Sequence, residues 1–137
     1  MTQSISSAQR LGFQPVELLG RWRVDESATV AHEAERLNVS TAQMRRDLEW
    51  SGYLAVTLAF EERAFSLTYD GETAPRHVAT YTRASGIPCG INQIWLQFTW
   101  DEMMAQPFQY LLVTQHGPNH IEVEWPNDRF IHCRRQP

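Results

Sequence analysis

Lysine is absent from this chain of 137 residues, so all twelve basic side chains are arginines. Sixteen aspartates and glutamates outnumber them, and the formal net charge is −4. A domain that binds nucleic acid usually carries a basic face, so we expect no nucleic-acid partner. No apolar run approaches the roughly 18 residues of a membrane helix, and we expect no membrane partner either.

Cysteine is scarce as well, with Cys89 and Cys133 the only two. The N-terminal residues lack the apolar stretch of a secretion signal. We therefore predict a cytoplasmic protein with both thiols reduced. The sequence also lacks a nucleophile motif, a glycine-rich phosphate loop, zinc-ligand spacing and a paired-carboxylate pattern. For this reason we predict no metal and no cofactor.

What the sequence does contain is enough apolar material for a core: 42% of the residues are hydrophobic and 20% are charged. This length and composition predict one folded domain rather than a disordered chain. Residues 1–15 are polar and end at Pro15, so we predict a flexible N-terminal tail over 1–15 and a single domain over 16–137. A monomer and a homodimer both fit.

The spacing of apolar residues changes near the start of this domain. Residues 18–25 alternate between apolar and polar side chains, which predicts a half-buried strand. Residues 28–37 then carry small apolar side chains at every third position, which predicts a short amphipathic helix. Ser40 and Gln43 have the spacing of a capping box and open a second helix that Gly52 ends. The apolar stripes of both helices are thin, so we expect the pair to form a lid over an opening.

The rest of the chain predicts seven further strands separated by turn residues. Their predicted ranges are 53–60, 65–70, 76–83, 91–100, 108–115, 121–125 and 129–135. Together with the first strand, they predict a mainly β fold: a single antiparallel β-barrel of about eight strands with a two-helix lid after the first strand. An α+β cone, with helices packed on a curved sheet, is the alternative.

This layout resembles the calycin-type barrels, namely the fatty-acid-binding proteins and the lipocalins. The residues that carry the resemblance are Gly20-Arg21-Trp22, which match the Gly-x-Trp of the first strand in those families. In lipocalins this Trp plugs the closed end of the barrel and an Arg of the last strand packs over it. The resemblance therefore implies that Arg129 or Arg134 packs over Trp22 here. Fatty-acid-binding proteins have ten strands and an Arg-x-Tyr clamp for a carboxylate. The last strand here has no Tyr, so the clamp is not carried over.

Two groups of polar residues are candidates for a site. His77, Tyr81 and Arg83 share one face of a predicted strand and would place a base, a hydroxyl group and a cation in one pocket if that face looks inward. The sequence leaves the direction of this face open. His116 and His120 flank a predicted turn and could hold a metal with a third ligand, but two solvated loop residues are the interpretation we favour.

Aromatic residues crowd the second half of the chain, where they would either fill the barrel or line a pocket. Our candidate ligand-binding residues are Tyr69, His77, Tyr81, Arg83, Trp95, Tyr110 and Arg134. The best interpretation is a protein that binds a small hydrophobic or amphipathic molecule inside a lipocalin-like barrel. The alternatives are a barrel enzyme such as a cyclase, isomerase or decarboxylase acting on an apolar substrate, and a structural or interaction module with a filled core. No catalytic residue is predicted.

Overall fold

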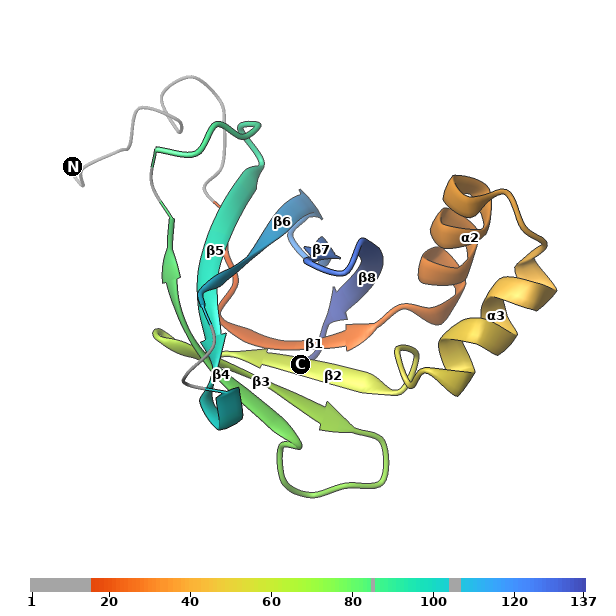
Figure 1. The fold of residues 1–137 in the computed structure, drawn as a ribbon, viewed down its shortest axis with the longest axis horizontal. Helices are drawn as coiled ribbons and strands as arrows, with labels where there is room; N and C mark the ends of the chain where they lie inside the picture. The colour runs from red at the N-terminus through yellow and green to blue at the C-terminus, as the bar shows by residue number, and fades with distance from the viewer. Residues whose placement is uncertain (1–15, 85, 104–106) are drawn as a thin grey trace.

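This computed structural model describes residues 16–84, 86–103 and 107–137, so the expected tail over 1–15 lies outside the described residues. Eight strands form a closed antiparallel barrel in which each strand pairs with the next along the chain (Figure 1). The barrel closes where Trp22 of the first strand pairs with Arg135 of the last. The structure therefore confirms the predicted eight-stranded barrel with two helices after the first strand. The strands are β1 Gly20–Val24, β2 Val56–Phe60, β3 Ala64–Tyr69, β4 His77–Arg83, β5 Gln93–Trp100, β6 Gln109–Gly117, β7 His120–Trp125 and β8 Arg129–Arg135.

The two helices between β1 and β2 have the ends that their sequences predict. Helix α2 (Glu26–Leu37) begins where the side chain of Asp25 accepts a hydrogen bond from the backbone of Ala28, and it ends at Asn38 in the left-handed conformation. Helix α3 (Thr41–Trp50) begins at Ser40, which accepts from the backbone N–H of Gln43. Only half of the expected capping box forms, because the Gln43 amide group bonds to Asp47 instead. Neither helix is long and apolar enough to span a membrane, nor is any other helix in the described part of the chain.

Alternation along the strands separates the barrel interior from its surface. In β2, Val56, Leu58 and Phe60 are buried while the residues between them are partly exposed. The same period of two recurs in β6 and β7. Apolar side chains from all eight strands therefore meet inside one barrel, which is the core that the sequence pattern predicts.

Trp22 is fully buried and joins the first strand to the last. Its indole N–H donates to the Leu18 carbonyl at 2.8 Å, and the Arg135 guanidinium lies 4.2 Å from the centre of a Trp22 ring. The prediction that Arg129 or Arg134 packs over this Trp is wrong. Arg135 does so because it is the residue directly opposite Trp22 in the strand register. A Cβ atom at Gly20 would meet the Arg135 side chain at 3.1 Å. Gly20 also has a φ of +120°, a conformation that other residues rarely adopt. Both the close contact and the backbone conformation therefore favour glycine here.

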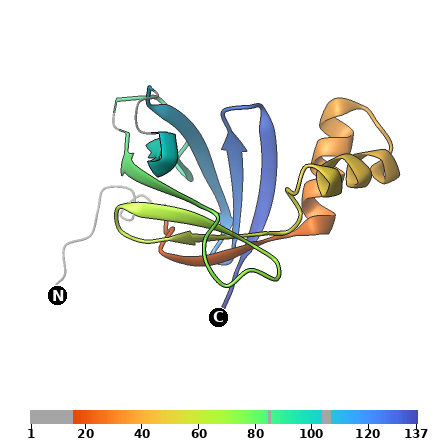
Figure 2. The same ribbon diagram turned by 60° about the horizontal axis from the view of Figure 1, so that its bottom comes forward.

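Helix α2 docks on the outer face of β8, and α3 packs mainly against α2, so both helices lie beside the barrel wall (Figure 2). The buried charge in this contact is Glu33, whose carboxylate is fully enclosed. It accepts hydrogen bonds from Arg36 of the same helix at 2.7 and 2.8 Å and from Arg129 of β8 at 2.8 Å. Burial by itself raises the pKa of Glu33, but the two guanidinium groups outweigh burial and hold its pKa below the ordinary value.

We predict that Trp22→Ala lowers the free energy of unfolding by about 3–5 kcal/mol, the usual cost of truncating a buried Trp. Trp50→Ala is the matched control, because Trp50 is 92% exposed. Denaturant titration of both variants measures the difference. Losses of equal size in the two variants would contradict a role for Trp22 in closing the barrel.

We predict that Glu33→Gln destabilises the fold by about 3 kcal/mol at neutral pH, because it removes one partner from a buried ion pair. Since the pKa of Glu33 is lowered in the folded state, its contribution is complete above the unfolded value of about 4.5 and is lost as the pH falls through the folded pKa. The two proteins should thus converge in stability in acid. Glu35→Gln, on the exposed side of the same helix, is the control. A constant difference across the whole pH range would refute this account of Glu33.

Candidate functional site

The barrel contains a cavity of about 620 Å³. It is bounded by inward-facing side chains of β2, β3, β5, β6, β7 and β8, by the segment after α3 and by the β7–β8 turn. Most of its surface is apolar or aromatic. The lining residues are Ser51, Tyr53, Val56, Leu58, Leu67, Tyr69, Phe98, Trp100, Gln109, Trp125, Pro126, Asn127 and Ile131.

Aromatic rings form one wall of the cavity. The rings of Trp100 and Trp125 stack with centroids 6.2 Å apart and an interplanar angle of 15°. Phe98 meets both of them edge-on, at 5.4 and 6.3 Å. Aromatic and apolar side chains with few polar groups are typical of small-molecule pockets.

One polar atom in this wall lacks a partner. The indole N–H of Trp125 is buried and makes no hydrogen bond to any described residue. A buried donor without a partner costs roughly 1–3 kcal/mol of desolvation. The Trp125 side chain lines the cavity, but this N–H has essentially no accessible surface, so it would meet a ligand oxygen only after the ring turns.

The polar groups at the cavity are neutral. Asn127 donates to the Tyr53 hydroxyl group at 2.5 Å, which ties the β7–β8 turn to the segment after α3. Arginines lie behind the two lining tyrosines: Arg129 over the ring of Tyr53 at 5.4 Å and Arg76 over the ring of Tyr69 at 4.0 Å. Neither guanidinium is among the lining residues, so the described lining offers no cation for an anionic group of a ligand.

The structure separates the residues that we predicted as a ligand site. Tyr69 lines the cavity. His77 lies beside it, 5.8 Å from the ring of Trp100, and bonds to Glu102. Tyr81 is buried against Phe60 and Phe65, where its hydroxyl group donates to the Glu61 carbonyl at 2.6 Å.

The face of β4 that carries His77 and Tyr81 therefore looks inward, the direction that the sequence left open, but its residues do not converge. Burial raises the pKa of Tyr81. Arg83, at the end of the strand, is exposed.

The other three predicted site residues lie on the outside of the barrel. The Trp95 indole group donates to the Pro88 carbonyl at 3.3 Å, and Tyr110 is 42% exposed. Arg134 pairs with Asp25 on the outer face of β8. Phe98 and Trp125, by contrast, point into the barrel. The aromatic side chains of the second half of the chain therefore lie on both the inner and the outer face of the barrel wall.

Comparison with known proteins identifies no relative of this chain. No family model, curated protein or solved structure matches this chain. An antiparallel barrel of eight strands with two helices after β1 is consistent with a calycin-like barrel. That likeness rests on the order of the elements and on the packing around Trp22.

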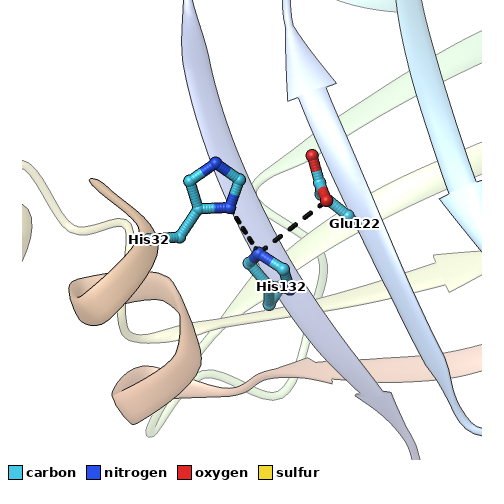
Figure 3. A group of neighbouring side chains, drawn as sticks. All are labelled: His32, Glu122 and His132. Carbon is cyan, nitrogen blue, oxygen red and sulfur yellow. Dashed lines mark hydrogen bonds and ion pairs between the residues drawn. The ribbon is translucent and has the colours of Figure 1, made fainter. Parts of the chain in front are cut away.

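A second group of polar residues lies outside the barrel, between α2 and the outer faces of β7 and β8 (Figure 3). His132 of β8 is at its centre: Nε2 lies 2.7 Å from Nδ1 of His32 in α2, and Nδ1 lies 2.8 Å from Nε2 of His120 in β7. His116 bonds to Glu122 at 2.8 Å, and Glu122 lies 3.9 Å from His132 Nε2. Four histidines and one carboxylate thus form one contiguous group, which we call the histidine cluster.

The histidine cluster is neutral at its centre. Burial is the largest influence on His132 and, together with its three histidine neighbours, lowers its pKa to about 4, although Glu122 acts in the opposite direction. Burial also lowers the pKa of His120. The imidazoles of His120 and His132 therefore each offer one lone pair at neutral pH, which is the form that binds metal ions.

Sequence reasoning found only part of this cluster. We expected His116 and His120 to be solvated loop residues, yet Glu122 lies against His116 and both imidazoles belong to the cluster. His132 lies on the outer face of β8, opposite the side that Ile131 and Cys133 present to the core. Nothing in the sequence marked His32, because its approach depends on where α2 docks.

Thr29 of α2 fixes the backbone at His132. It is fully buried, accepts from the His132 N–H at 2.9 Å and donates to the His132 carbonyl at 3.3 Å. Because β1 leaves the sheet after Val24, this side chain replaces a strand partner for the His132 N–H, while the Asp25 N–H still donates to the His132 carbonyl at 2.8 Å.

We predict that Thr29→Val lowers the free energy of unfolding by about 1–3 kcal/mol, since it keeps the shape of the side chain and leaves the buried His132 N–H without this partner. Thr82→Val, at an exposed position of β4, is the matched control. Urea unfolding measures both variants. If Thr29→Val costs no more than Thr82→Val, Thr29 does not anchor the helix.

Proposed function

We propose that this protein binds one small hydrophobic or amphipathic molecule inside its barrel. The observation that carries the proposal is the cavity of about 620 Å³, whose lining is apolar and aromatic and includes the side chain of Trp125. Pockets of about 300–1,000 Å³ with this kind of lining are typical of small-molecule sites.

The chemistry of the lining narrows the ligand class. No arginine or carboxylate is among the described residues that line the cavity, so a charged group would lose its hydration without gaining an ion pair. A neutral oxygen, by contrast, would gain the Trp125 N–H as a donor once that ring turns toward the cavity. The preferred ligand is therefore an apolar body with an uncharged hydroxyl or carbonyl group.

The same lining favours binding over acid–base catalysis within the cavity. Its only titratable side chains among the described residues are those of Tyr53 and Tyr69. A general acid or base near neutral pH is most often a histidine or a carboxyl group. His77 approaches the cavity but its ring bonds to Glu102. A carrier thus has more support than an enzyme, and the cavity of about 620 Å³ gives a module with a filled core less support.

The test uses N-phenyl-1-naphthylamine, an uncharged dye that fluoresces in apolar surroundings, with decan-1-ol and decanoic acid as competitors. We expect micromolar binding of the dye, displacement by the alcohol at lower concentration than by the acid, and a raised melting temperature with the alcohol. Leu67→Trp, which fills part of the cavity, should weaken dye binding about tenfold, equivalent to ~1.4 kcal/mol. Leu112→Trp, on the outer face of β6, is the matched control.

A second pair of variants tests the polar handle. Trp125→Phe should weaken binding of decan-1-ol about fivefold to tenfold, the value of one hydrogen bond, with little effect on the dye. Trp95→Phe removes an indole group on the outside of the barrel and should change neither. The proposal is wrong if the wild-type protein binds neither the dye nor the alcohol, or if Leu112→Trp weakens binding as much as Leu67→Trp.

A further inference from the structure

The histidine cluster lies outside the barrel and takes no part in the cavity. Four of the five histidines of the chain belong to it, brought together from α2, β6, β7 and β8. Imidazole groups gathered in this way with a carboxylate need an explanation that barrel packing does not supply. We propose that His32, Glu122 and His132 form a binding site for one divalent transition-metal ion such as Zn²⁺.

The first support for this proposal is the geometry of the three ligand atoms. His32 Nδ1, His132 Nε2 and a carboxylate oxygen of Glu122 all lie within 4.8 Å of one another (Figure 3). Zinc binds imidazole nitrogen at about 2.0–2.1 Å in tetrahedral geometry, which places two ligand atoms about 3.3 Å apart. The two imidazole nitrogens, now 2.7 Å apart in a hydrogen bond, need to separate by about half an ångström to admit the ion. His32 is on a half-buried helix surface and can supply that movement.

The second support is the set of groups behind the ligands. Metal-binding imidazoles usually donate their other ring N–H to a partner that fixes the tautomer. His132 has such a partner, since its Nδ1 lies 2.8 Å from Nε2 of His120. The Glu122 carboxylate is held by His116 at 2.8 Å in the same way. Both proposed ligands on the barrel are therefore already oriented by neighbours.

The third support is that the two ligands on the barrel are held rigidly while the site stays open to solvent. His132 and Glu122 project from paired positions of β7 and β8, which the barrel holds in place. A surface depression lined by Ala28, His32, Glu35, Arg36 and His132 opens beside them. Two His and one carboxylate with a free fourth position is the ligand set of an open zinc site, whereas closed structural sites use four protein ligands. A water molecule or an anion reaching in past Arg36 would take the fourth position.

Bound metal would join α2 to the barrel through a coordinate bond. The ligands come from the helix and from two strands, so binding should stabilise the docked helix by mass action on the native state. This sets the site apart from adventitious binding at His116 and His120, which sit on one hairpin and would not involve α2.

The experiment uses the full chain without a polyhistidine tag, stripped of metal with EDTA. Competition with a chromophoric chelator measures Zn²⁺ affinity, and the visible absorption of Co²⁺ reports coordination geometry. We expect one equivalent of Zn²⁺ per chain, Co²⁺ bands of a four-coordinate or five-coordinate site, and a higher melting temperature with Zn²⁺. His32→Asn and Glu122→Gln should each weaken Zn²⁺ binding more than about 100-fold, and His120→Asn, which removes an orienting partner, about 10–100-fold.

His77→Asn is the matched control, because His77 is the one histidine placed outside the cluster. It should leave Zn²⁺ affinity unchanged. Thermal unfolding of every variant in EDTA confirms that it is folded, and buried His132 is left intact for that reason. The proposal is overturned if the wild-type protein binds no Zn²⁺, if His77→Asn weakens binding as much as His32→Asn, or if His32→Asn keeps the affinity while His116→Asn loses it.

Discussion

The docking of α2 on the outer face of β8 is the contact on which both candidate sites depend. It is made where β1 leaves the sheet, and the Thr29 hydroxyl group accepts from the His132 N–H there in place of a strand. Glu33 then ties the helix to Arg129 with a buried carboxylate. Because α2 lies against the wall, the segment after α3 reaches the cavity, and the outer face of β8 becomes buried enough to hold neutral imidazoles.

Two strands serve both sites because successive residues of a strand face opposite ways. In β8, Ile131 lines the cavity and the next residue, His132, is the centre of the histidine cluster. In β7, Trp125 lines the cavity and Glu122 projects outward. A ligand inside the barrel and an ion outside it would therefore sit on either side of one wall, and each would stiffen a strand that the other contacts.

The sequence predicts the fold well because the fold is local in origin. Alternation and turn residues mark eight strands, and Asn38, Ser40 and Gly52 mark helix ends, so the element order follows from neighbours along the chain. The sites depend on register and docking, which the sequence does not reveal. Arg135 rather than Arg134 meets Trp22 because of one residue of register. Trp95 and Tyr110 face outward although they sit among core aromatics, and His32 reaches His132 across 100 positions only once α2 has docked.

The central claim is that the barrel is hollow and takes a ligand from within. Nuclear Overhauser contacts between N-phenyl-1-naphthylamine and methyl groups of the protein test it most directly. Leu67 and Ile131 line the cavity, whereas Leu112 lies on the outer face of β6. We predict contacts from the dye to the methyl groups of Leu67 and Ile131 and none to those of Leu112. Contacts to Leu112 alone, or no contact to any inward methyl group, would contradict the account.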